Sequence, residues 1–167
     1  CCVNQKMLEK GDKKLKRKLV ENIVNSLETL ILDPFANYVL QCCMAIGYED
    51  LNKRVVSYCS NDFTLYAMNK YSSNVIDKAL SHLKIEDRNN YINLAMKDLD
   101  FLASLALDLY ANHLFQKILL HASPENKKKI FEIIKKNVKK LKSTQHGEKL
   151  LNRIKTSYSI NFDDFNN

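Results

Sequence analysis

The chain has 167 residues, of which 46% are hydrophobic, and its formal net charge is +7. This is enough for one ordinary domain with its own core, and the basic charge permits an anionic partner without requiring one. With only three glycines and two prolines, the composition argues against a turn-rich β fold and for an all-helical chain. No stretch is apolar enough to predict a membrane span, so we expect no membrane partner.

The first predicted element is an amphipathic helix that begins after Gly11 and Asp12. We expect the chain to be a fragment from the C-terminal part of a longer protein. The apolar residues of the helix recur at every fourth position, namely Leu15, Leu19, Ile23 and Leu27. This spacing places them on one face of the helix.

Three later stretches follow one pattern: DPFANYVLQ from Asp33, NKYSSNVIDK from Asn69 and DLYANHLFQK from Asp108. Each opens with a residue that commonly caps a helix N-terminus. A fourth and degenerate copy, STQHGEKLLNRI, opens with Ser143, which we expect to act as its cap. We therefore predict a capped helix in each copy.

The copies recur at nearly constant spacing. Counted on the second polar residue of each pattern, Asp77 lies 36 residues after Gln41, and Gln116 lies 39 residues after Asp77. Leu151, the equivalent residue of the fourth copy, follows 35 residues later. A period of this length is typical of helical solenoids, in which each repeat buries its apolar face against the next.

Amphipathic segments separate the capped helices. One begins at Leu51 with Val55 and Tyr58, and another follows Ser123 and Pro124. The apolar face of the second is formed by Ile130, Ile133, Ile134, Val138 and Leu141. Each unit is thus predicted to contain a helix, a short helix, a cap and a second helix. We expect an all-α, right-handed α-solenoid.

Each full copy carries two polar residues four positions apart, which place their side chains on one face of the helix. The pairs are Asn37 with Gln41, Ser73 with Asp77, and Asn112 with Gln116. A flat side chain follows the first member of each pair: Tyr38, Asn74 and His113. Hydrogen-bonding pairs beside flat groups suit the edges and faces of bases in single-stranded RNA. The alternative is that these residues are exposed polar groups on a solvated face, or caps and bridges between repeats.

The motifs DPFANYVLQ, KYSSNVIDK, DLYANHLFQK and HGEKLLNRI resemble the sixth, seventh and eighth repeats and the terminal cap of the Pumilio (PUF) family of RNA-binding domains. The resemblance covers the chain except for its last residues. It makes residues 1–160 the C-terminal part of a Pumilio homology domain, with the end of one repeat at 1–11, three repeats and a capping half-repeat. Residues 161–167 form an acidic tail.

In that family each repeat contacts one base. The resemblance implies that the base edges are contacted by Asn37, Gln41, Ser73, Asp77, Asn112 and Gln116. It implies that bases stack on Tyr38, Asn74 and His113. In the family, Asn with Gln selects uracil and Ser with Glu selects guanine. The RNA binds antiparallel to the protein chain, so its 5′ end meets the C-terminal repeat. The resemblance therefore implies that the chain reads 5′-UGU. Asp77 departs from the pattern, since the family has Glu there, and we expect it to prefer guanine less strongly than Glu does.

The fourth copy places Gly147, Glu148 and Leu151 at the reading positions. Glycine and leucine cannot contact a base edge through hydrogen bonds. We therefore predict that this copy is a cap that covers the last apolar face of the solenoid.

The resemblance implies a monomeric, cytoplasmic regulator of mRNA translation or decay that binds single-stranded RNA in 3′-untranslated regions and recruits protein effectors. Two alternatives remain: a nucleolar Pumilio-like protein with weak sequence preference, and a protein-binding solenoid of the armadillo or HEAT type. No nucleophile–base set or phosphate-binding loop occurs, so we expect no enzyme. The five cysteines have no CxxC spacing and no histidine pair has metal-ligand spacing, so we expect neither a metal nor a cofactor.

Overall fold

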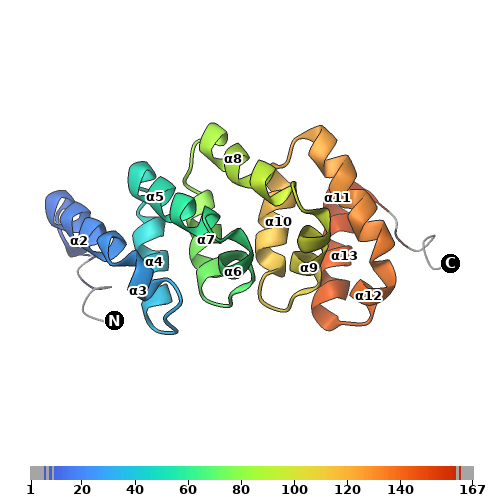
Figure 1. The fold of residues 1–167 in the computed structure, drawn as a ribbon, viewed down its shortest axis with the longest axis horizontal. Coiled ribbons are helices and arrows are strands. Elements are labelled where there is room, and N and C mark those ends of the chain that lie inside the picture. Colours follow the sequence, from blue (N-terminus) through green and yellow to red (C-terminus); the bar gives the residue numbers. More distant parts are fainter. Residues whose placement is uncertain (1–5, 7, 9, 161, 163–167) are drawn as a thin grey trace. The chain divides into compact units, whose positions relative to one another are not determined.

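The structure is a computed structural model that describes Lys6, Leu8, residues 10–160 and Phe162. Within these residues the regular elements are all helices (Figure 1). They are α2 (Lys13–Asn25), α3 (Leu27–Leu30), α4 (Ala36–Ala45), α5 (Glu49–Ser60), α6 (Phe63–Met68), α7 (Ser72–Leu80), α8 (Ile85–Ala95), α9 (Leu99–Leu107), α10 (Asn112–His121), α11 (Pro124–Lys136), α12 (Val138–Lys142) and α13 (Gln145–Tyr158). None of them is long and apolar enough to cross a membrane.

The helices follow the predicted order of a longer helix, a shorter helix, a capped turn and a second helix. The chain forms two compact units, Cys1–Tyr91 and Ile92–Asn167. The first unit contains the series α2–α3–α4 and α5–α6–α7, and the second ends with α11–α12–α13. The predicted segment at 1–11 lies largely outside the described residues, and so does the acidic tail at 161–167 apart from Phe162, which is buried.

Side-chain caps mark the starts of the helices. Asp12, Asp62 and Asp98 each accept a hydrogen bond from the backbone N–H three residues later, at 2.8, 3.1 and 2.8 Å. The predicted cap at Ser143 is wrong by one residue, because the Oγ1 of Thr144 accepts from the N–H of Gly147 at 3.2 Å. The Ser143 hydroxyl donates instead to the Lys140 carbonyl at the end of α12, at 2.8 Å.

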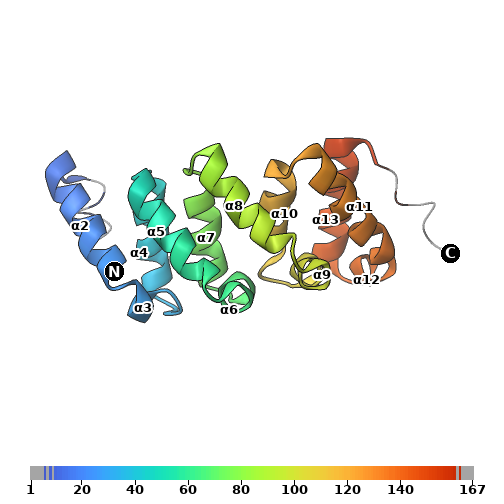
Figure 2. The ribbon, with the colours of Figure 1, turned by 45° about the horizontal axis from the view of Figure 1, so that its top comes forward.

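In the first unit α4 packs against α7, while α2 packs against α5 (Figures 1 and 2). The contacts bury the apolar faces of these helices, including Leu40, Met44, Val55 and Ile76, all of them 0% exposed. The predicted stripe spans two helices, because α2 ends at Asn25 and Leu27 begins α3; it is buried at Ile23 and Leu27 but is 44% exposed at Leu15, in the first turn of α2. The unit thus holds α4 and α7 next to each other by apolar packing.

In the second unit α10 packs against α9 and α13, and α12 packs against α13. The predicted stripe behind Ser123 is confirmed as core, because each of its five members is at most 8% exposed. Phe115 and Ile118 of α10 are 0% exposed. This packing brings α13, far along the chain, next to α10.

Candidate nucleic-acid interface

The same capped turn precedes α4, α7 and α10. Oδ1 of Asp33 accepts from the N–H groups of Phe35 and Ala36, at 2.8 and 2.6 Å. Oδ1 of Asn69 and of Asp108 accept in the same way from the residues two and three positions later. The three side chains therefore cap the turn that leads into each helix, while the helices themselves begin later, at Ala36, Ser72 and Asn112. The turn fixes where each helix begins and therefore which side chains occupy its first turn.

Asn37 and Gln41 on α4 form a chain of hydrogen bonds that starts at the backbone. Nδ2 of Asn37 donates to the carbonyls of Pro34 and Asp33, at 2.7 and 3.4 Å. Its Oδ1 accepts from Nε2 of Gln41 at 3.0 Å. Because Asn37 is only 3% exposed and its donors are used, its oxygen must face Gln41. We call this arrangement the amide relay; it turns Oε1 of Gln41 away from Asn37.

The same relay occurs on α10. Nδ2 of Asn112 donates to the carbonyls of Asp108 and Leu109, at 3.0 and 2.9 Å. Oδ1 of Asn112 accepts from Nε2 of Gln116 at 3.1 Å. Here Oε1 of Gln116 also accepts from Nη1 of Arg153, at 2.7 Å. Sequence reasoning missed Arg153, because it belongs to α13 and lies 37 residues from Gln116.

The pair on α7 lacks the relay. Ser73 is 0% exposed, and its hydroxyl has no hydrogen-bond partner among the described residues. Asp77 is half-buried, one turn further along the same helix. A buried hydroxyl without a partner costs roughly 1–3 kcal/mol, and such groups in native structures call for an explanation. The position therefore combines a carboxylate with an unused donor.

The three residues predicted to stack on bases differ in how they are presented. Tyr38 is 59% exposed, so its ring has a free face. Asn74 is half-buried, and its Nδ2 donates to the Lys70 carbonyl at 2.7 Å. His113 is half-buried, and its Nε2 is buried without a partner in the described part of the chain. Tyr38 is thus the best presented of the three for stacking.

Helix α13 has the register of a reading helix but offers different groups. A Cβ atom on Gly147 would lie 2.2 Å from the Leu141 carbonyl oxygen, so only glycine fits where the other copies have Asn or Ser. Leu151 is 5% exposed and belongs to the core. Helix α13 therefore offers no polar side chain at either of these two positions, and the capping role of the fourth copy stays a prediction.

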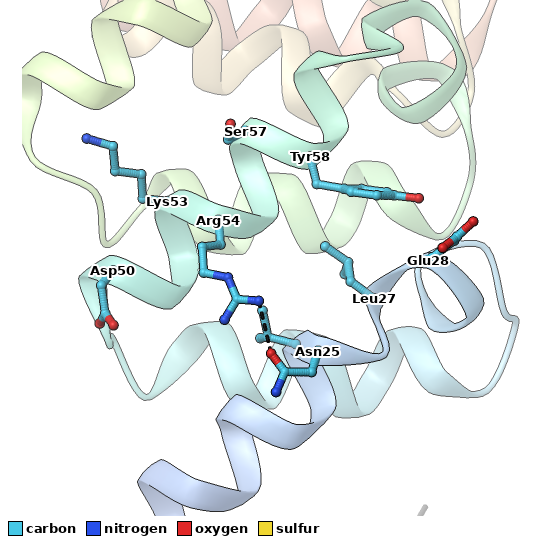
Figure 3. Close-up of a pocket in the computed structure, with 9 residues that line it drawn as sticks. Asn25, Leu27, Glu28, Asp50, Lys53, Arg54, Ser57 and Tyr58 are labelled. Atoms are coloured by element: carbon cyan, nitrogen blue, oxygen red, sulfur yellow. Dashed lines mark hydrogen bonds between the residues drawn. The ribbon is translucent and has the colours of Figure 1, made fainter.

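A groove of about 570 Å³ lies elsewhere in the first unit, between α2–α3 and α5 (Figure 3). Arg54 spans it and donates to Oδ1 of Asn25 at 3.0 Å. At its border Asp50 accepts a hydrogen bond from Arg17, which lowers the pKa of the Asp50 carboxyl. The groove contains none of the predicted site residues, and its charges are of both signs.

The three cysteines in the described part of the chain, Cys42, Cys43 and Cys59, are free thiols. Cys43 and Cys59 are buried free thiols, and burial raises the pKa of each to about 12. Thiols with so high a pKa are poor nucleophiles and metal ligands at neutral pH. Within the residues that the structure describes, no cluster of His, Cys, Asp and Glu could hold a metal ion.

Comparison with known proteins gives one consistent family. A family model described as the Pumilio-family RNA binding repeat matches residues 1–24, 28–57, 63–93 and 102–135. A Pumilio domain-containing protein of Schizosaccharomyces pombe is 29% identical over 92% of the chain, and Pumilio homolog 12 of Arabidopsis thaliana is 28% identical over 92%. The chain spans 22% and 26% of the length of these two relatives.

Solved structures agree on the fold. The Puf3 RNA binding domain bound to the Cox17 RNA 3′ UTR recognition sequence matches 98% of the chain with a TM-score of 0.79 and 21% identity. The RNA-binding domain of yeast Puf5p bound to SMX2 RNA matches 93% with a TM-score of 0.75 and 23% identity. The chain covers 46% and 45% of those two chains.

These likenesses confirm the predicted fold class, an all-α solenoid of Pumilio-type helical repeats. The matched repeats cover more than half of the chain and include α4, α7 and α10, the helices that carry the three polar pairs. The chain therefore belongs to the Pumilio family of non-enzymatic RNA-binding repeat proteins.

Proposed function

We propose that the chain binds single-stranded RNA and reads the sequence 5′-UGU, one base per helix on α10, α7 and α4. The observation that carries the proposal is the amide relay, which occurs with the same partners on α4 and α10. The relay orients one glutamine carboxamide at the same position of both helices, as reading one base per helix requires. The solved relatives named above are bound to RNA, which supports the same class of ligand.

The relay suits uracil for a chemical reason. Uracil presents its N3–H donor between two carbonyl acceptors, whereas cytosine presents an N3 acceptor beside an amino donor. With Nε2 of Gln41 directed to Asn37, its Oε1 is an acceptor for N3–H, and the second Nε2 proton can reach a uracil carbonyl. Cytosine would place its N3 lone pair against Oε1. The fixed orientation of Gln41 therefore favours uracil.

The pair on α7 suits guanine, whose edge presents two donors, N1–H and the N2 amino group. The Asp77 carboxylate offers acceptors only, so it cannot match the acceptor N1 of adenine. The resemblance expects Glu at this position, and Asp is shorter by about 1.5 Å, one C–C bond. Ser73 has an unused hydroxyl on the same helix and would find a partner if its side chain turned toward a bound base.

The order of the bases in 5′-UGU rests on the antiparallel binding that the resemblance implies.

The proposed cellular role is that of the Pumilio family. We propose that residues 1–160 are the C-terminal part of a longer RNA-binding domain, and that the monomeric protein acts in the cytoplasm on mRNA 3′-untranslated regions together with protein effectors. Neither a nucleolar relative with weak sequence preference nor an armadillo or HEAT solenoid would need the repeated amide relay.

The test substitutes the polar pair of α4 so that it should select a different base. Asn37→Ser together with Gln41→Glu should move the preference at the third base from U toward G, by roughly 1–3 kcal/mol for one matched base edge. The matched control makes the same change on α10, Asn112→Ser with Gln116→Glu, and should alter only the first base. Fluorescence anisotropy with labelled RNAs that differ at one position measures both.

The expected affinity of the chain for a short UGU oligonucleotide is modest. Each stacked base contributes roughly 1–3 kcal/mol, and association itself costs several kcal/mol, so we expect a Kd of about micromolar or weaker. If the α4 exchange leaves the preference for U at the third base unchanged, Asn37 and Gln41 do not read that base, and the proposed function is wrong.

A further inference from the structure

Arg153 makes the α10 position different from the α4 position. Its Nη1 donates to Oε1 of Gln116 at 2.7 Å, while Nε2 of the same carboxamide donates to Asn112 at 3.1 Å. The Gln116 carboxamide is therefore held at both ends. The carboxamide of Gln41 is held only at Nε2, because no described residue donates to its Oε1.

The number of restraints matters because a terminal amide can turn over. The last torsion of a glutamine side chain is soft and roughly twofold, so rotation exchanges the positions of its oxygen and nitrogen. Rotation of Gln41 would break one hydrogen bond, the one to Asn37. Rotation of Gln116 would also direct its NH₂ group at Arg153, which has no acceptor. Charge-assisted bonds such as this one are about twice as strong as neutral ones.

Orientation of the amide decides which pyrimidine fits. A glutamine with its oxygen toward the base accepts from the N3–H of uracil, and a turned glutamine donates to the N3 of cytosine. The oxygen of Gln116 has two lone pairs, so it can accept from Arg153 and from a base together. A contact to Arg153 thus leaves the site able to bind uracil while it hinders the turned form.

We propose that Arg153 is a positioning residue that fixes the Gln116 carboxamide for uracil and against cytosine at the first base. This inference rests on the proposed function and deepens it, since it assigns a specificity role to a residue outside the three polar pairs. It follows that α10 discriminates U from C more strongly than α4 does, although both helices carry Asn and Gln.

The experiment measures U-to-C affinity ratios at two positions. Arg153→Met removes the donors and keeps a long apolar stem, and labelled RNAs carry U or C at the first or the third base. We expect the ratio at the first base to fall about tenfold and the ratio at the third base to stay unchanged. Arg153→Lys keeps a cationic donor and should recover part of the ratio.

Lys149→Met provides the control for charge, because Lys149 is an exposed cation on the same helix. It should change the affinity for U and C alike and leave both ratios intact. If Arg153→Met lowers the affinity for U and C equally, with a smaller salt dependence, then Arg153 contacts phosphate and the inference is wrong. Tighter binding of U by the variant would show competition with the base and would overturn it too.

The outcome also separates the inference from the function it rests on. A parent chain that prefers U at both positions, with a variant that keeps the ratio at the first base, overturns the role of Arg153 alone. A parent chain that fails to distinguish U from C at either position overturns both. Thermal unfolding of Arg153→Met checks that the variant remains folded, which we expect because the Arg153 side chain is exposed.

Discussion

Helices α4 and α10 carry the same polar pair yet present it differently. Both begin after an aspartate-capped turn whose carbonyls hold the Asn side chain, so the amide relay is a product of local sequence. The differences come from elsewhere: Asn37 is buried where Asn112 is half-buried, and among the described residues Gln116 receives a bond from another helix while Gln41 does not. If these pairs read bases, we therefore expect identical pairs to differ in selectivity, because the neighbouring helix α13 adds its own restraint on α10.

Helix α7 marks the limit of this similarity. It has the same capped turn, through Asn69, but its first polar residue is a serine with a buried hydroxyl. Nothing in the described residues holds that hydroxyl, so Asp77 is not oriented by Ser73 as Gln41 is by Asn37. Under the proposed function, we expect base selectivity at α7 to depend mainly on the charge and acceptors of Asp77.

The largest effect is expected when the comparison is extended to α13. Gly147→Asn would give α13 the first reading residue of α4 and α10, but the new Cβ would lie 2.2 Å from the Leu141 carbonyl oxygen. That oxygen belongs to the backbone, so α12 and α13 must separate. We expect a loss of about 2 kcal/mol or more in the free energy of unfolding, measured by urea denaturation.

Gly147→Ala should lose nearly as much, because the clash arises at Cβ, and Lys149→Ala on the exposed face of α13 should change stability by less than about 0.5 kcal/mol. If Gly147→Asn unfolds at the same urea concentration as the parent, α13 can move away from α12 freely. The distinction between cap and reading helix would then rest on sequence alone.

The next prediction compares the relays directly. Asn37→Ala removes the one hydrogen bond by which a described residue orients Gln41, so the U-to-C ratio at the third base should fall about tenfold. Asn112→Ala leaves Gln116 bonded to Arg153, so the ratio at the first base should fall only about threefold. Anisotropy with singly substituted RNAs measures both. Equal losses in the two variants would contradict the difference between the two helices.

Local features of the fold could be predicted because they depend on neighbouring residues. Asp33, Asn69 and Asp108 were predicted as caps from residue type alone, and the Ile130–Leu141 stripe was predicted as core from its spacing. The cap of α13 is predicted one residue too early, since Ser143 and Thr144 are both common cap residues and the hydroxyl of Ser143 is bonded to the Lys140 carbonyl of α12.

Features of the candidate site that depend on packing could not be predicted. The burial of Ser73 follows from its place in the first unit, where α7 packs against α4. The bond from Arg153 to Gln116 joins residues on two helices that are distant in sequence. A periodic pattern predicts candidate reading positions, but it carries no information on which side chain from another helix reaches them.

A smaller difference between α4 and α10 is expected for the residues predicted to stack on bases. Tyr38 has a ring that is 59% exposed, so Tyr38→Ala should weaken RNA binding by about fivefold, toward the low end for one stacked base. His113→Ala should weaken it by less, because that ring is half-buried with Nε2 inside. Titrations with UGU RNA measure both, and a larger loss for His113→Ala would show that the ring turns outward on binding.

The smallest effects are expected at Asp77, where α7 has neither a relay nor the longer side chain. A guanine must approach the helix more closely to reach this carboxylate, or a water must bridge the gap. Asp77→Glu should therefore tighten binding to UGU RNA by about threefold, as one hydrogen bond becomes direct, and should leave binding to UAU RNA nearly unchanged.

Asp77→Gln replaces an acceptor with a donor that can reach N1 of adenine, so it should shift the preference at the second base from G toward A. Ser73 stays unchanged in both variants, which makes any shift attributable to residue 77. If both variants distinguish G from A as the parent does, Asp77 does not read the base, and the second letter of the proposed site is wrong.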